Sequence, residues 1–178
     1  MCIHLGLPMH VDRRLWGEIT RYAAKWRGTD VAVKILRGSL SHAQLESAAA
    51  EIIRELNTMR RVGNHRHIVS LLGICHLQFP ARLAIVTDFM HRGSLLDVLK
   101  GKTGEPPAHV DVVRIAAEVA AGISHLHREG VVHRDLAARN VLVDKHYSAR
   151  VGDFGYACAD ARLGGVGSVH CGGGSRVS

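Results

Sequence analysis

The sequence predicts an α+β protein arranged in two layers or lobes. Short apolar runs of strand length dominate the first half of the chain, around one helical pattern at residues 41–61. The second half contains another long helical pattern at residues 111–127, followed by short apolar pieces. A polar turn at residues 91–94 separates the halves. Strands with one helix, then a hinge, then helices with short strands are typical of two packed α+β parts.

The first half is expected to form three strands and one helix. A Gly-containing turn precedes an apolar strand at residues 31–36, which is rich in Val and Ile. Residues 41–61 carry apolar side chains at helical intervals, and Gly63 is the expected C-terminal stop. Two further apolar runs, at residues 68–74 and 83–89, have the length and composition of strands.

The second half is expected to be mainly helical. Residues 95–100 begin a short helix, and a connection containing Gly and Pro leads to the helix at 111–127. Short apolar pieces at 131–132 and 141–143 flank a polar segment. Residues 151–178 contain eight glycines and no strong period, which indicates loop or disorder. The residues expected to share one buried face of the long helix are Val112, Ile115, Val119, Ile123 and Leu126.

Composition and charge narrow the function classes. The chain has 178 residues, 47% of them hydrophobic and 22% charged, as in ordinary globular proteins. The net charge of +7 comes from scattered Lys and Arg, so we expect a solvated basic surface and no nucleic-acid partner. No apolar run is long enough to span a membrane, and the first ten residues lack a secretory pattern. The four cysteines are far apart and predict neither a disulfide framework nor a zinc site. The expected location is the reducing cytoplasm, or the cytoplasmic part of a receptor.

The polar segment of the second half carries the strongest functional signal. Residues 133–140 read His-Arg-Asp-Leu-Ala-Ala-Arg-Asn, and Asp-Phe-Gly follows at residues 153–155. Lys34 ends the Val-Ala-Val-Lys sequence within the strand at residues 31–36, and Glu55 lies on the first helix. In this order and spacing, the four pieces resemble the motif set of protein kinase catalytic domains over residues 11–156. The resemblance implies a two-lobed protein-kinase-like fold, with an antiparallel sheet and one helix in the first lobe and an incomplete helical second lobe.

The resemblance implies a reaction, the transfer of the γ-phosphoryl group of Mg-ATP to a protein hydroxyl. Such transfer depends mainly on positioning and charge neutralisation. Lys34 would reach the α- and β-phosphates, and Glu55 would hold its ammonium. Asp135 would accept or orient the proton of the substrate hydroxyl. Asn140 and Asp153 would supply oxygen ligands to Mg²⁺.

The same loop indicates the acceptor. Arg139, in the Ala-Ala-Arg-Asn form of the loop, resembles the tyrosine kinases and the tyrosine-kinase-like group. Serine/threonine kinases usually carry a lysine where this chain has Ala137. The expected partner is therefore a protein substrate with an acceptor tyrosine, and Ser or Thr acceptors stay open.

The resemblance also places the nucleotide base. Thr87 would be the gatekeeper residue, and backbone groups of Asp88 and Met90 would hydrogen-bond the adenine. A flat apolar ring needs an apolar slot with few polar anchors. The residues that would line this slot and reach the ribose are Ala32, Leu142 and Asp97.

The glycine-rich phosphate loop of the family is altered in this chain. Val11, Gly17 and Ile19 fit its pattern and would cover the nucleotide, but Asp12 and Arg14 stand where its first two glycines belong. Glycines there let the backbone approach the phosphates closely and offer N–H groups. A side chain obstructs that approach and an aspartate repels phosphate, so we expect these two residues to weaken ATP binding.

The resemblance predicts a partial kinase domain at residues 1–156 that is truncated at its C-terminal side. No proline follows Pro107, so the family's Ala-Pro-Glu motif is absent. The expected boundaries are about 1–88 for the first lobe, 88–93 for the hinge, 94–156 for the partial second lobe and 157–178 for a disordered Gly-rich tail.

Two other function classes stay open. A truncated or pseudokinase-like module that binds partners with little or no catalysis is favoured by the altered glycine loop. A small metal-binding protein is suggested only by the 13 histidines. The pairs that suggest it are His65 with His67, His125 with His127, and His170 with Cys171. Residues two apart on a helix face different directions, which weakens the pair His125 and His127, and scattered surface histidines are the expected outcome.

Overall fold

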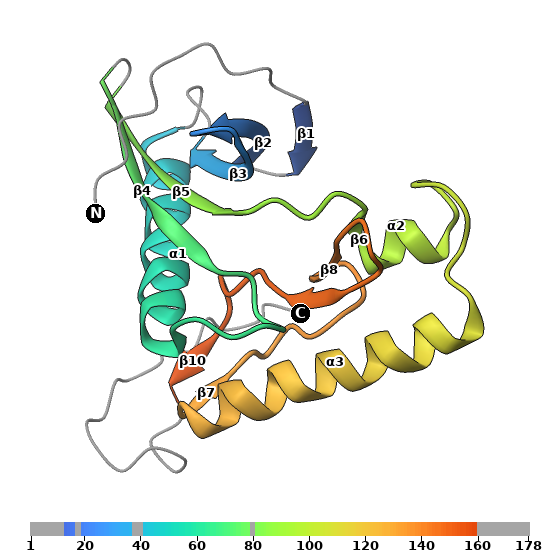
Figure 1. Ribbon diagram of the computed structural model, residues 1–178. Coiled ribbons are helices and arrows are strands. Elements are labelled where there is room, and N and C mark those ends of the chain that lie inside the picture. The colour runs from blue at the N-terminus through green and yellow to red at the C-terminus, as the bar shows by residue number, and fades with distance from the viewer. Residues whose placement is uncertain (1–12, 17–18, 37–40, 79–80, 160–178) are drawn as a thin grey trace, which may run out of the picture.

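The computed structural model describes residues 13–16, 19–36, 41–78 and 81–159 of the chain. An antiparallel sheet with helix α1 beside it forms one part, and two helices with short strands form the other (Figure 1). The prediction of a two-lobed α+β fold, with an antiparallel sheet and one helix in the first lobe, is confirmed.

The first lobe is built on a five-stranded sheet with the strand order β1-β2-β3-β5-β4. Its strands are β1 (Arg13–Trp16), β2 (Ile19–Trp26), β3 (Thr29–Leu36), β4 (Leu71–Gln78) and β5 (Ala81–Asp88). Successive side chains of a strand point to opposite faces. Val31 and Val33 of β3 are fully buried in a cluster with residues of β2, β4 and β5, so Ala32 and Lys34 face the other side. This alternation turns Lys34 away from that cluster.

Helix α1 (His42–Val62) covers the same lobe and ends close to where the sequence predicts. Its amphipathic stripe is buried, and the stripe comprises Ala48, Ile52, Leu56, Met59 and Val62. Gly63 follows with φ 66°, and its amide donates to the Met59 carbonyl at 3.1 Å. A residue without Cβ adopts this left-handed conformation easily, so glycine ends the helix here.

The second lobe consists of two helices and short strands. They are β6 (Gly93–Ser94), α2 (Leu95–Leu99), α3 (His109–Arg128), β7 (Val131–Val132), β8 (Val141–Val143), β9 (Ala149–Val151) and β10 (Cys158–Ala159). Strand β10 pairs with β7, and Ala157 before it is buried. Residues 157–159 therefore correct the predicted start of a disordered tail, because they pair with and pack on the second lobe. Residues 160–178 lie outside the described residues.

The apolar run at residues 68–74, predicted as one strand, divides its pairing between the lobes. Strand β4 begins only at Leu71. Ile68 instead forms a parallel bridge with Val151 of β9, and the Val69 amide donates to the Val151 carbonyl at 2.9 Å. Ile68 and Val69 are buried at the joint between the lobes. Their apolar character reflects this burial and not an extension of strand β4.

One hydrophobic cluster spans this joint. Ile52 and Met59 of α1 pack in it together with Leu126 of α3 and the fully buried ring of Phe154. The cluster fixes α1 against the second lobe, and thereby fixes the side chains that α1 carries toward the space between the lobes.

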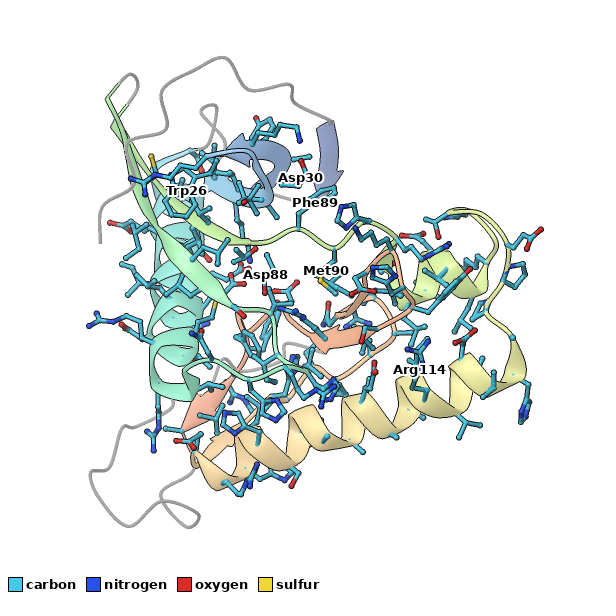
Figure 2. The ribbon with its side chains drawn as sticks, viewed as in Figure 1. Trp26, Asp30, Asp88, Phe89, Met90 and Arg114 are labelled. Atoms are coloured by element: carbon cyan, nitrogen blue, oxygen red, sulfur yellow. The ribbon has the colours of Figure 1, made fainter. Side chains whose placement is uncertain are left out.

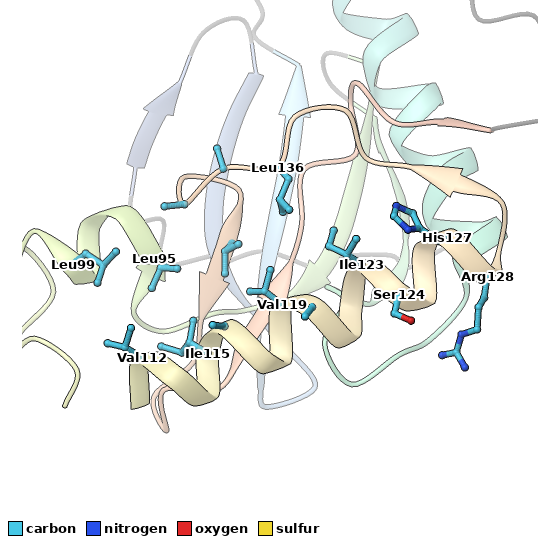
Figure 3. A pocket seen from close by; sticks show the side chains of 15 residues that line it. Leu95, Leu99, Val112, Ile115, Val119, Ile123, Ser124, His127, Arg128 and Leu136 are labelled. Carbon is cyan, nitrogen blue, oxygen red and sulfur yellow. The ribbon is translucent and has the colours of Figure 1, made fainter. Parts of the chain in front are cut away.

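Helix α3 buries only part of the face predicted for it. Ile115 and Leu126 are buried, but Val112 is 40% exposed. One side of α3 packs on β9, while the other lines an open apolar groove with α2 and Leu136 (Figure 3). The prediction was wrong for Val112 because the end of the apolar stripe has no covering element among the described residues.

Gly122 of α3 supports a stability prediction. A Cβ at this position would lie 2.6 Å from the His67 carbonyl oxygen and 3.3 Å from Val151 Cγ2. Alanine normally favours a helix over glycine, but here the clash is with backbone and decides the sign. We expect Gly122→Ala to lower the free energy of unfolding by about 1–3 kcal/mol, measured as the urea midpoint. Ser124→Ala, an exposed change on the same helix, should stay within about 0.5 kcal/mol, and an equal effect of both would contradict the clash.

Histidines stack across the joint between α1 and α3. The rings of His65 and His125 lie 4.4 Å apart at an interplanar angle of 10°, and His67 contacts His65 edge-on. Burial, together with the positive charges of His125, His67, Arg128 and Arg66, holds the pKa of His65 below its ordinary value of 6.5. The folded state therefore resists protonation at this joint.

This lowered pKa predicts acid sensitivity. Between the folded pKa and about 6.5 the unfolded chain binds more protons at His65 than the folded chain does, so stability falls as the pH drops below about 6.5. We expect His65→Gln to flatten that decline in urea unfolding measured from pH 7.5 to 5. His109→Gln, an exposed change at the start of α3, should leave the wild-type slope intact. Identical slopes in all three proteins would refute the assignment.

Candidate active site

A cleft between the lobes gathers most of the residues singled out by the sequence. Its floor comes from β8, the loop before it and the segment after β9, and its roof from β2, β3 and α1. The predicted site residues that line it are Ala32, Lys34, Glu55, Thr87, Asp88, Met90, Asp97, Asp135, Arg139, Asn140, Leu142 and Asp153. Val11 and Gly17 lie outside the described residues, and Ile19 begins β2, opposite Trp16 and Leu36.

The roof of the cleft contains a buried ion pair. The Lys34 ammonium donates to Glu55 of α1, and both side chains are 8% exposed. Asp153 Oδ1 lies 3.6 Å from the same ammonium. The pair joins the central strand to α1, while Asp153 belongs to the opposite side of the cleft. A charged lysine is thereby presented to any anion that enters.

The loop between β7 and β8 holds Asp135 at the floor. The Asn140 amide Nδ2 donates to the Asp135 carboxylate and to its backbone carbonyl, both at 2.8 Å. Arg139 pairs with the other carboxylate oxygen of Asp135. His133 Nε2 lies 2.9 Å from the Gly152 carbonyl, which ties the loop to the segment that carries Asp153. Asp135 and Asp153 are therefore fixed relative to each other through the His133 ring and the Gly152 backbone.

Asp153 adopts a strained backbone. Its φ is 62°, a left-handed conformation that a residue with a Cβ rarely adopts. The Asp153 carboxylate and the Asn140 amide both line the cleft, and such oxygens are the donors that Mg²⁺ prefers. The donor set is therefore compatible with a magnesium ion held together with phosphate oxygens.

The segment after β5 forms the far end of the cleft, where Asp88, Phe89 and Met90 lie (Figure 2). The Gly93 amide donates to the Met90 carbonyl at 3.0 Å, which turns the chain toward α2. The Asp88 carboxylate accepts from the Ser70 amide at 3.0 Å and pairs with a side chain of β9. Its side chain thus braces the segment, so only the backbone of Asp88 suits the expected contact with a base.

Asp97, expected near the ribose, is held at the start of α2. Its amide donates to Ser94 Oγ at 3.1 Å, Ser94 Oγ donates to its carboxylate at 2.7 Å, and Lys102 lies 3.3 Å away. Ser94 Oγ therefore caps the helix, and the Asp97 carboxylate accepts from this hydroxyl and forms a surface ion pair with Lys102 at the rim of the cleft.

Three residues of the site were missed by the sequence interpretation. Glu51 lines the cleft one turn before Glu55, Arg54 donates to the Gly155 carbonyl at 2.8 Å, and Arg150 pairs with Asp88. The four-residue spacing of Glu51 and Glu55 was the one signal available, because it places both on one helix face.

The metal alternative finds no support in the part of the chain that the structure describes. There, no three His, Cys, Asp or Glu side chains come together as a metal site.

None of the described helices is both long and apolar enough to cross a membrane.

The cleft has the arrangement of a protein kinase active site. A buried lysine–glutamate pair lies on one side, and a loop with Asp and Asn and a second aspartate lie on the other. The family model described as protein tyrosine and serine/threonine kinase matches residues 11–162. The chain therefore belongs to the protein tyrosine and serine/threonine kinase family, as the sequence predicts.

Its relatives include both kinds of kinase. The chain is 38% identical to tyrosine-protein kinase Src64B of Drosophila melanogaster over 155 residues. This match covers 86% of this chain and 26% of that protein. It is 34% identical over 161 residues to serine/threonine-protein kinase STY46 of Arabidopsis thaliana, covering 90% of this chain and 26% of that protein. With serine/threonine-protein kinase CTR1 of Arabidopsis thaliana it shares 40% over 139 residues, or 76% of this chain and 16% of that protein. The chain thus spans about a quarter or less of these relatives' lengths.

Proposed function

We propose that this chain binds Mg-ATP in the cleft and transfers the γ-phosphoryl group to a protein hydroxyl. The observation that carries the proposal is the convergence of Lys34, Glu55, Asp135, Asn140 and Asp153 on one cleft between the lobes. Membership of the kinase family supports the same reaction. Phosphoryl transfer requires positioned charges and metal ligands more than covalent chemistry, and these five side chains supply them.

Each of these side chains has one task in this proposal. Lys34, held by Glu55, binds the α- and β-phosphates, and its burial keeps the ammonium directed into the cleft. Asp135 orients the acceptor hydroxyl and takes its proton, while Arg139 beside it balances the local negative charge. Magnesium, when bound, neutralises the phosphate charge, and Asn140 and Asp153 are the residues that would hold it.

The nucleotide itself is proposed to lie along the same cleft. Its base would lie in the apolar slot, its ribose toward the start of α2, and its phosphates beside Lys34 and Asp153. The residues proposed to contact it are Val11, Gly17, Ile19, Ala32, Thr87, Asp88, Met90, Asp97 and Leu142.

The acceptor is proposed to be a tyrosine of a protein substrate, with Ser or Thr as the alternative. The Ala-Ala-Arg-Asn form of the loop favours tyrosine, and relatives named for each specificity are similarly close. Because the reaction consumes ATP, the proposal places the chain in the cytoplasm, free or as the inner part of a receptor.

Transfer of labelled γ-phosphate to mixed tyrosine and serine/threonine peptides tests the proposal. Label should appear on peptide only with both ATP and Mg²⁺, and phosphoamino-acid analysis should identify the acceptor. Thermal shift with Mg-ATP, run beside zinc, measures binding separately. Binding without transfer would replace the proposal by the pseudokinase-like alternative, which the side chains at positions 12 and 14 favour. Neither binding nor transfer would reject both.

A further inference from the structure

Helix α1 brings a second carboxylate to the cleft lysine. Glu51 lies one turn before Glu55, on the same face of the helix. Glu51 Oε1 is 3.8 Å from Lys34 Nζ, and Asp153 Oδ1 is 3.6 Å from the same nitrogen. Glu55 makes the closest contact. One ammonium therefore faces three carboxylates, two of them from α1.

The two helix carboxylates differ in exposure. The side chain of Glu55 is 8% exposed, whereas that of Glu51 is 37% exposed. A buried pair is rigid, and losing one partner leaves a charge uncompensated. A carboxylate in contact with solvent holds the lysine less strongly but can adjust its position. Glu55 therefore acts as the primary partner, and Glu51 is placed to become the next one.

Glu51 is also confined by the loop that carries Asp153. A Cβ on Gly155 would lie 2.9 Å from Glu51 Cγ and 3.0 Å from Glu51 Oε1. Arg54, on the next turn of α1, donates to the Gly155 carbonyl at 2.8 Å. The carboxylate of Glu51 thus has the loop on one side and the lysine on the other, so its adjustment is limited to the space beside Lys34.

We propose that Glu51 is a positioning residue, a second anchor that keeps the Lys34 ammonium in the cleft together with Glu55. Lys34 faces Asp153 across the cleft, while the reaction proposed above requires Asp153 for the metal and Lys34 for phosphates. Two anchors on α1 let the ammonium leave Asp153 without leaving the cleft. This catalytic purpose rests on the proposed function, whereas the anchoring itself requires no nucleotide.

Acylation by acetic anhydride, read by peptide mass spectrometry on the full chain without nucleotide, tests the anchoring. Lys34 is 8% exposed, so it reacts slowly while it is anchored, and the exposed Lys25 and Lys102 are internal references. We expect Glu55→Gln alone to raise Lys34 labelling only about 2-fold, and the Glu51→Gln/Glu55→Gln pair to raise it about 10-fold, as for coupled contacts.

Three comparisons make the test specific. Glu51→Gln in a chain that retains Glu55 should change labelling by less than about 2-fold, since the primary partner remains. Glu46→Gln, which removes a carboxylate from an exposed position of α1 outside the cleft, is the matched control and should add nothing to Glu55→Gln. Equal labelling of Glu55→Gln and the double variant would overturn the proposal.

Folding and function are separated by two further arms. If Glu55→Gln does not fold, the same series on Glu55→Asp, which shortens the primary carboxylate, gives the comparison. Addition of Mg-ATP to the wild-type chain should protect Lys34 from labelling if the proposed function holds. Absence of protection would count only against the proposed nucleotide binding and not against the anchoring, because the anchoring is measured on samples without nucleotide.

Discussion

Asp135→Asn should lower the rate of phosphoryl transfer by about 10²- to 10⁴-fold, the contribution typical of a positioned general base. Asn140 Nδ2 donates to Asp135 Oδ2 at 2.8 Å, and Arg139 contacts the other oxygen. An amide of the same shape keeps one oxygen for Asn140 but cannot take the proton of an acceptor hydroxyl. Initial rates of labelled-phosphate transfer to peptide, with wild type in parallel, measure the loss.

The apparent affinity for ATP should change less than about 2-fold in the same variant, because Asp135 is proposed to act on the acceptor and not on the nucleotide. Asp30→Asn, which removes an exposed carboxylate from the start of β3, outside the cleft, is the matched control and should leave the rate unchanged. A rate as high as that of wild type, or a fall explained by lost ATP affinity alone, would remove Asp135 from its proposed role.

The convergence of the cleft residues could be anticipated because each lies in a local pattern. Lys34 lies in an alternating strand, and Glu55 lies between Ile52 and Met59 of the helical stripe, so the directions of both side chains were determined by the periods of strand and helix. Asp135 and Asn140 are five residues apart and meet within one loop. Such short-range geometry follows from the local sequence.

The contacts that the sequence did not indicate depend on packing between distant segments. Arg150 meets Asp88 across 62 residues, and neither lies in a pattern that names a partner. Ile68 and Val69 have the composition of a strand, but their pairing with Val151 exists only once the lobes are joined. Glu51 shares a face with Glu55, yet the loop that confines it against Lys34 comes from a hundred residues further along, at Gly155.

The largest stability effect is expected for Phe154→Ala. The ring is fully buried among residues of α1, α3 and β7, and lies 5.4 Å from the His133 ring. Truncation of a buried Phe usually costs about 3–5 kcal/mol, because lost burial is added to the cost of a cavity. That is a large share of the roughly 5–15 kcal/mol by which domains are stable. Urea unfolding at pH 7.5 measures the change.

Phe154→Ala should also disturb Asp153, because the two residues are adjacent and burial of the Phe154 ring offsets the strained backbone of Asp153. Asp153 has φ 62°, a conformation that costs roughly 1–3 kcal/mol, and burial of the next side chain helps to maintain it. Phe154→Leu keeps an apolar side chain in the cluster, so it should cost less than about 1.5 kcal/mol and preserve Mg-ATP binding. If the Ala and Leu variants unfold at the same urea concentration, the Phe154 ring does not join the lobes as its burial indicates.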